Sequence, residues 1–296
     1  MKKRVSALIL IVFLFSTFLV YFKFVRRTKG FSLNKIVSSY PPNAIWQTKP
    51  PDNLEEIFSG PFYYLGSGKE CYAFVSENNQ YVIKFFKQKH MRIKHPLNVF
   101  SFIPSIQQYV AEKQKKHASL RNKMFQSYWI AFHELPEETG VIFLHLSKTH
   151  NLKRKGLFYD QNKHPFVLDL DQMEFLIQRK AEPVFTAIAD FYQRGEEIKT
   201  KQVLQNILAL IIERCKKGIG DEDMNCERNL GVVGTKAMEI DVGEFYQGFP
   251  ITEPSLLKKE LEKATIDLCS YLNQLHPKWS EFLQSEIKRI TEDGSL

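Results

Sequence analysis

The sequence predicts an α+β protein with a small antiparallel β-rich lobe containing one helix and a larger helical lobe, both following an N-terminal transmembrane helix. Three observations point to this fold class. Between Phe62 and Phe86, three short apolar segments are separated by glycine and asparagine turns, the pattern of a β-meander. The second half of the chain instead carries apolar residues at helical spacing. The N-terminal region contains an uncharged apolar run, Val5 to Phe22.

The apolar run has the length of a single membrane-spanning helix. It is 18 residues long, which just suffices to cross a hydrocarbon core of roughly 30 Å. A secretory signal peptide is the competing interpretation, but the end of the run lacks the small residues that a signal peptidase reads. Basic residues flank both ends, so the positive-inside rule favours a cytoplasmic body only slightly. We therefore predict a single-pass anchor within residues 1–29, with the body in the cytoplasm.

Positive charge is concentrated in one part of the chain. The net charge is +8, and between Asn78 and His133 ten Lys or Arg residues accompany a single acid, Glu112. Such a surface could lie on anionic lipid or hold phosphate groups, although a solvated basic face is a common alternative. Nucleic acid is not an expected partner, because no nucleic-acid-binding module accompanies the charge.

The pattern along the chain divides it into four parts. After the anchor, residues 30–60 are rich in Ser, Pro and Asn and predict a surface tether. Residues 61–147 predict the β-rich lobe, and residues 148–296 predict the helical lobe. Expected strands cover 62–65, 71–75, 81–86, 129–135 and 141–146, a basic loop covers 148–163, and expected helices cover 106–128, 169–192, 200–217, 257–275 and 279–290.

Residues 218–245 combine an acidic loop with a tight hairpin. Asp221, Glu222 and Asp223 precede Asn229, and Asp241 follows the second apolar segment of the hairpin. Because the two open ends of a hairpin meet, the amide of Asn229 and the carboxylate of Asp241 are expected to converge on one hard cation. Magnesium bound through few protein oxygens suits such a site. Alternatively, Asn229 caps a turn and Asp241 begins one.

A lysine stands in the apolar strand Tyr81 to Phe86. Lys84 could extend to the surface, but a lysine in a partly desolvated cleft needs a counter-charge. Glu112 is the first carboxylate after it in the sequence, on the helix expected to face the sheet. The alternative is that Glu112 relieves repulsion between lysines of its own helix.

This order of elements and residues resembles the protein-kinase-like fold over about Phe62 to Phe245, and it is similar to little-characterised membrane-anchored kinase-like proteins of intracellular bacteria. The resemblance implies ATP and Mg²⁺ as cofactors. It implies that Gly66 and Gly68 cover the phosphates, Lys84 holds them, Glu112 orients Lys84, Asn229 and Asp241 bind the metal, and Asp223 or Asp221 is the catalytic base.

The sequence also departs from that family's pattern. Cys71 replaces the third glycine of the phosphate loop, so Gly66 and Gly68 could belong to a plain hairpin. Met224 stands five residues before Asn229, where the catalytic Asp is expected, whereas Asp223 lies six before it. No Ala-Pro-Glu triplet follows Asp241, which favours a small or envelope-associated acceptor over a polypeptide. Three hypotheses remain: a membrane-anchored phosphotransferase, an inactive pseudokinase scaffold, and an anchored protein whose basic helix, residues 113–123, lies on anionic lipid.

Overall fold

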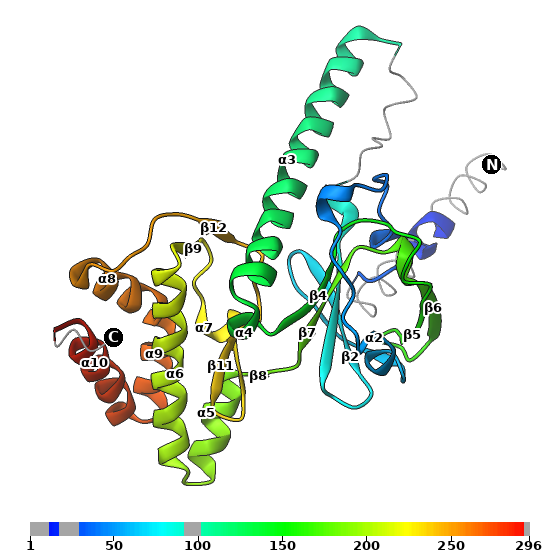
Figure 1. Cartoon of the computed structure of the whole chain (residues 1–296). Helices are drawn as coiled ribbons and strands as arrows, with labels where there is room; N and C mark the ends of the chain where they lie inside the picture. Colours follow the sequence, from blue (N-terminus) through cyan, green and yellow to red (C-terminus); the bar gives the residue numbers. More distant parts are fainter. Residues whose placement is uncertain (1–11, 18–29, 92–101, 293–296) are drawn as a thin grey trace.

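The structure, a computed structural model, describes residues 12–17, 30–91 and 102–292 (Figure 1). It is an α+β fold with an N-terminal sheet and a helical C-terminal part. The main sheet has seven strands in the order β4-β7-β3-β2-β1-β5-β6, in which only the β1–β5 pair is parallel. Its strands are β1 (Phe62–Ser67), β2 (Cys71–Ser76), β3 (Tyr81–Phe86), β4 (Val141–His145), β5 (Lys155–Tyr159), β6 (Pro165–Asp169) and β7 (Phe175–Arg179).

Helix α3 (Pro104–Glu134) crosses from the sheet into the space beyond the body of the molecule (Figure 1). The expected strand over 129–135 is therefore wrong, because the helix continues to Glu134. Phe125, Tyr128 and Ala131 recur at helical spacing and are buried, so packing on one face extends the helix. The chain then turns through α4 (Pro136–Thr139) and Gly140, whose φ of 61° is easily adopted by glycine.

The sheet reaches further along the chain than expected. The basic segment 148–163 contains β5, and the predicted helix over 169–192 is replaced by β7 and a helix that begins only at Val184. Leu176, which has helical spacing with Met173 and Lys180, is fully buried between the neighbouring strands β3 and β4, and this pairing overrides the helical spacing. The β-rich part thus extends to Arg179 rather than ending at residue 147. A short 3-10 helix, η5 (Leu170–Gln172), connects β6 to β7.

Residues 30–60 are not a surface tether but pack onto the sheet. Phe31, Ile36 and Ile57 are buried in the same apolar cluster as strands β1 to β3. Ser38 also donates a hydrogen bond of 2.6 Å to the buried carboxylate of Glu174. The segment contains the short helices η1 (Leu33–Lys35), η2 (Ala44–Trp46) and α2 (Leu54–Ile57), and η3 (Gln88–His90) follows β3.

The C-terminal part is built around α6 (Glu197–Lys216), of whose 20 residues ten are buried, and it confirms the helix expected over 200–217. The predicted hairpin is confirmed, because β10 and β11 pair antiparallel around Gly234. The other elements are β8 (Glu182–Pro183), α5 (Val184–Gln193), β9 (Ile219–Asp221), α7 (Cys226–Asn229), β10 (Leu230–Val233), β11 (Lys236–Glu239), β12 (Phe245–Gln247), α8 (Pro254–Ala264), α9 (Ile266–Leu275) and α10 (Pro277–Glu292).

The predicted anchor, Val5 to Phe22, lies largely outside the described residues. Over the ranges that the structure does describe, none of the helices combines the length and the apolar character needed to cross a bilayer.

Candidate functional site

Two cavities meet where the β1–β2 turn faces the C-terminal part. The first, which we call the linker cavity, has a volume of about 320 Å³ and lies against Gln178–Pro183, the segment that joins the sheet to the helices. The second, the acidic cavity, has a volume of about 350 Å³ and is lined by Asp223, Asn229 and Asp241. Gly68, Lys69, Glu70, Arg228 and Asp241 line both cavities, so the two cavities adjoin along these residues, and we call the pair the cleft.

Lys84 and Asp241 line the linker cavity together. Strand β3 presents Lys84 to the cleft, and its ammonium donates a hydrogen bond to the backbone carbonyl of Ile240. Burial lowers the pKa of Lys84, and the nearby Asp241 carboxylate opposes this effect. A cation bound to one backbone carbonyl and not ion-paired at contact distance within the described residues can attract a further anion, such as a phosphate group, at the edge of the cavity.

Glu112 does not pair with Lys84, which corrects the predicted ion pair. Its side chain is exposed on α3 and accepts a hydrogen bond of 3.2 Å from Gln108. The α3 side chain that lines the linker cavity is instead Tyr128, 16 residues further along. That separation corresponds to roughly 24 Å along a helix axis. The sequence showed which helix would face the sheet, but not which turn of it.

Tyr128 and Glu70 are site residues that the sequence reasoning missed. The hydroxyl of Tyr128 lies 3.6 Å from the Cys71 sulfur and donates to the Glu70 carboxylate at 3.4 Å. Burial raises the pKa of Glu70 to about 7, and the Asp241 and Glu244 carboxylates add to this effect. The only available signal was the position of Glu70 directly after the Gly66-Ser67-Gly68-Lys69 turn.

The glycine turn, Gly66 to Gly68, borders the cleft, and no neighbouring atom requires glycine at these two positions. A Cβ atom added at Gly66 or Gly68 would meet no atom within 4 Å, so neither glycine is required by a close neighbour. Gly68 lines both cavities, and its amide donates to the carbonyl of Cys71 at 3.1 Å. Open space above two glycines leaves room for a ligand to approach the backbone.

Asn229 and Asp241 stand at the open end of the β10–β11 hairpin, as predicted. The carbonyl of Asn229 accepts from the backbone amides of Ile240 at 2.6 Å and Asp241 at 3.4 Å. Its side-chain amide donates to the carbonyl of Asp223. These bonds hold the two residues on the wall of the acidic cavity.

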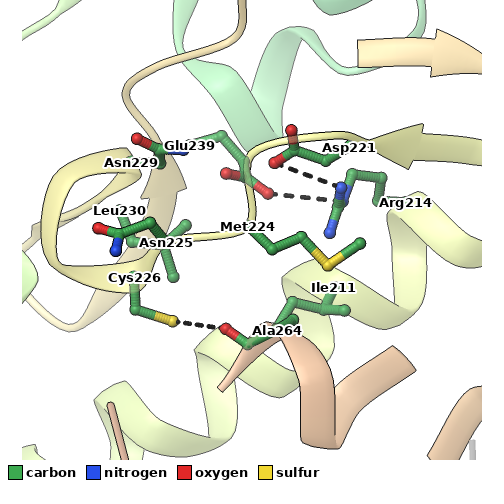
Figure 2. A pocket seen from close by; sticks show the side chains of 10 residues that line it. All are labelled: Ile211, Arg214, Asp221, Met224, Asn225, Cys226, Asn229, Leu230, Glu239 and Ala264. Carbon is green, nitrogen blue, oxygen red and sulfur yellow. Dashed lines mark hydrogen bonds and ion pairs between the residues drawn. The ribbon is translucent and has the colours of Figure 1, made fainter. Parts of the chain in front are cut away.

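The two candidate catalytic acids lie in different environments. Asp221 is buried, its carboxylate lies 3.6 Å from Arg214, and burial raises its pKa while Arg214 opposes the rise. Figure 2 shows Arg214 between Asp221 and Glu239, whose carboxylate is 3.5 Å away. Asp223 is about half exposed, lines the acidic cavity and pairs with Arg228 at 3.2 Å. Asp221 also lines the acidic cavity, but it is only 5% exposed and is placed to anchor the loop, whereas the half-exposed Asp223 is more accessible to a ligand.

The acidic cavity suits a divalent cation with few protein ligands. Asp241 and Asn229 contribute carboxylate and amide oxygens, which are hard ligands, to its wall. No group of three His, Cys, Asp or Glu side chains that could hold a metal occurs within the described ranges. Magnesium held here would take most of its ligands from water and phosphate.

No protein-family model and no curated protein sequence matches the chain. Among solved structures, it is similar to WbdD in complex with the kinase inhibitor LY294002, with a TM-score of 0.39, 16% identity, and coverage of 76% of this chain and 45% of WbdD. A structure of WbdD described as a bifunctional kinase-methyltransferase gives a TM-score of 0.36 at 15% identity and covers 84% of this chain and 46% of that one. Rv3197 from Mycobacterium tuberculosis, bound to erythromycin, gives a TM-score of 0.33 at 12% identity, and the match covers 74% of this chain and 56% of Rv3197. The chain thus spans about half the length of each. Because TM-scores this low do not establish a common fold, we draw no conclusion from the likeness.

Proposed function

We propose that this protein is an ATP- and magnesium-dependent phosphotransferase. The observation that supports it most is the single cleft that brings together Lys84, Asp223, Asn229 and Asp241. These residues come from β3, the acidic loop and both ends of the hairpin. The strand order β4-β7-β3-β2-β1 followed by a linker and helices agrees with the kinase-like resemblance of the sequence.

The linker cavity has the character of a nucleotide site. Ala73 and Val82 line it from the sheet, and Ile240 lines it from the hairpin, so a flat base can lie between apolar walls. Residues of the linker, including Lys180 and Ala181, border the same space. At the other end of this cavity, Lys84 would bind the phosphates and Gly68 would allow them to approach the backbone.

The acidic cavity contains the side chains that transfer of the γ-phosphate would require. Bound magnesium would neutralise charge on the phosphates, and Asp241 and Asn229 would hold it. Asp223 would accept the proton of the acceptor hydroxyl, whose oxygen bonds to the γ-phosphorus as the bond to the bridging oxygen breaks and ADP leaves. Glu112 takes no part in this scheme, and Asp221 acts only by positioning the loop.

Thermal unfolding with and without nucleotide tests the proposal. Full-length protein in a neutral-lipid nanodisc should gain stability with ATP and magnesium, because a ligand that binds only the folded state stabilises it by about 2.7 kcal/mol at 100 times its Kd. The Lys84→Met variant should lose this gain. An unchanged unfolding curve at saturating Mg-ATP would contradict nucleotide binding, and with it the proposed function.

A pseudokinase scaffold is the second candidate. It is favoured by the ion pair between Asp223 and Arg228 and by Cys71, which is buried where the family has a third glycine. In this case ATP binds but no phosphate is transferred. Transfer that disappears in Asp223→Asn while nucleotide binding persists would exclude this candidate.

We further propose that residues 5–22 anchor the protein, with its body in the cytoplasm and a small or envelope-associated acceptor as substrate. The support for the anchor is the uncharged apolar run alone, and the support for the acceptor class is that no Ala-Pro-Glu triplet follows Asp241 in the sequence. Deletion of residues 1–29 should move the protein from the membrane fraction to the soluble fraction. Protease accessibility in sealed vesicles would report the side on which the body lies.

A further inference from the structure

A third cavity of about 460 Å³ adjoins the acidic cavity on the side of helix α3. Its walls come from the glycine turn, from Leu120 and Met124 of α3, and from the segment after Asp241. We propose that this α3-side cavity receives the acceptor, and that the acceptor is an amphiphile with an anionic group close to its hydroxyl. This inference rests on the proposed phosphotransferase function and names the substrate class of that site.

Three lysines and three glutamates line the cavity, and the lysines are the groups that would bind an anion. Lys69 pairs with Glu244 at 2.7 Å, and Lys123 pairs with Glu222 at 2.6 Å. These pairs are solvent-exposed, and pairs of this kind contribute only about 0–1 kcal/mol, so a phosphate group can replace the carboxylates. The ammonium groups of Lys69 and Lys123 can then bind the ligand in place of Glu244 and Glu222.

The third lysine already lacks a carboxylate. Lys87 donates to the hydroxyl of Ser67 at 2.7 Å and to the carbonyl of Gly68, both neutral oxygens. Over the described ranges, no acidic side chain lies within ion-pair distance of it. Lys87 also lies 4.6 Å from the centre of the Tyr72 ring. Because none of these contacts neutralises its charge, it can attract an anion in the cavity, next to the glycine turn.

The opposite wall is apolar. Met91 and Met124 are buried, whereas Leu120 is 45% exposed and faces the same cavity. Methionine side chains adapt to irregular apolar ligands. Cations on one side and methionine and leucine on the other match a molecule with a charged headgroup and a hydrocarbon portion. A volume of this size falls in the range of small-molecule sites, roughly 300–1,000 Å³.

The position of the cavity fits the transfer step. Lys69, Glu70, Gly243 and Glu244 line both this cavity and the acidic one, so a hydroxyl at the shared boundary adjoins the space that Asp223 and Asp241 line. Its oxygen would bond to the γ-phosphorus, ADP would leave with the electron pair of the broken bond, and Asp223 would take the proton.

Calorimetric titration with three probes tests the inference. The full-length protein in neutral-lipid nanodiscs, loaded with magnesium and a non-hydrolysable ATP analogue, is titrated with hexanoyl-glycerol phosphate, glycerol phosphate or monohexanoyl glycerol. Empty nanodiscs provide the correction for partitioning. The first probe should bind about tenfold or more tightly than either of the others, because only it contacts both walls.

Two variants locate the binding. Lys123→Ala and Leu120→Asp should each weaken binding of hexanoyl-glycerol phosphate by about tenfold, whereas Lys116→Ala, an exposed α3 lysine away from the cavity, should not. Both target positions are exposed, so the variants should fold, and the Mg-ATP stability gain is measured on the same samples.

Each remaining outcome overturns the inference. Equal binding of glycerol phosphate would show that a free phosphate compound suffices, and equal binding of monohexanoyl glycerol would show that the anion is unnecessary. No binding by any probe, or equal loss in Lys116→Ala, would show that the acceptor does not occupy this cavity. If Mg-ATP still raises the thermal stability of the protein in those cases, only the assignment of the acceptor fails. If Mg-ATP does not raise the stability, the proposed phosphotransferase function fails as well.

Discussion

The side-chain amide of Asn229 donates a hydrogen bond to the backbone carbonyl of Asp223. Because the carbonyl of Asn229 also accepts from the amide of Asp241, this one residue fixes both the loop of the proposed base and the proposed metal carboxylate. The spacing of six residues between Asp223 and Asn229, one more than the family's pattern, is thus compatible with a connected site.

The two acids of the loop should respond differently to loss of charge. Asp223→Asn should abolish transfer while leaving stability nearly unchanged, because its pair with Arg228 is exposed. Asp221→Asn should instead cost about 1–3 kcal/mol of stability, because it removes one of two carboxylates beside the buried Arg214. Urea unfolding and a radiolabelled transfer assay on both variants would show this. The reverse pattern would assign the base to Asp221.

Lys84→Met should weaken Mg-ATP binding by about 10- to 100-fold, the usual effect of losing a charged hydrogen bond. Methionine keeps the length of the side chain, so β3 should stay intact. Lys89→Met is the matched control, because Lys89 lies five residues later, is exposed, and lines none of the cavities described above. Equal loss of binding in both variants would point to a general charge effect rather than a phosphate contact.

Asp241→Asn should remove the dependence of nucleotide binding on magnesium. The wild-type protein is expected to bind ATP more tightly with magnesium than without it, since Asp241 would hold the cation between protein and phosphates. In the variant, the two affinities should become similar. Titration with and without EDTA measures the difference, and Glu244→Gln serves as a control carboxylate on the same cavity. A variant that keeps the full magnesium effect would remove Asp241 from the metal site.

The contribution of Glu239 and Glu70 to stability should fall as the pH rises from about 4.5 to about 7, against a smaller opposite contribution from His145, whose pKa is lowered by burial. Burial raises the pKa of Glu239 to about 7, and the pKa of Glu70 is raised in the same direction. Over this window the folded state binds more protons than the unfolded chain, so the free energy of unfolding decreases with pH. For Glu239 the loss is at most about 3 kcal/mol.

Glu239→Gln should flatten this pH dependence, because the amide carries no charge at any of these pH values. Urea unfolding at several pH values between 4.5 and 8 would measure the slope for the wild type and the variant. A wild-type slope of opposite sign, or an identical slope in Glu239→Gln, would contradict the assignment of the effect to this residue.

Glu174 should be a major stabilising residue of the sheet. Its buried carboxylate accepts from Arg121 at 2.8 Å, from Gln88 at 2.9 Å and from Ser38 at 2.6 Å. Glu174→Ala should cost about 3–5 kcal/mol, because it leaves Arg121 buried without its partner. The exposed Glu137, paired with Lys236 at 3.0 Å, is the control, and Glu137→Ala should cost at most about 1 kcal/mol. Chemical denaturation would separate the two values clearly.

Several features of the site followed from the sequence because they depend on neighbours in the chain. The β1–β3 meander, the glycine turn and the β10–β11 hairpin are local, and alternation and turn residues suffice to predict them. Lys84 on its strand, and Asn229 and Asp241 at the ends of the hairpin, could therefore be placed in advance. Helix α6 could also be predicted in advance, because its apolar residues recur at helical spacing.

Other features depended on contacts between distant segments, and only the tertiary structure decided them. Residues 30–60 look like a linker by composition, yet Phe31 and Ile36 are buried in the sheet's apolar cluster. β7 has helical spacing, but pairing with β3 and β4 makes it a strand. The charge pattern favoured Glu112 as the partner of Lys84, whereas the crossing of α3 over the sheet brings Tyr128 to the cleft. Likewise, the burial of Arg214 beside Asp221 separates an anchoring acid from an accessible one, because burial and charge pairing are set by packing and not by sequence spacing.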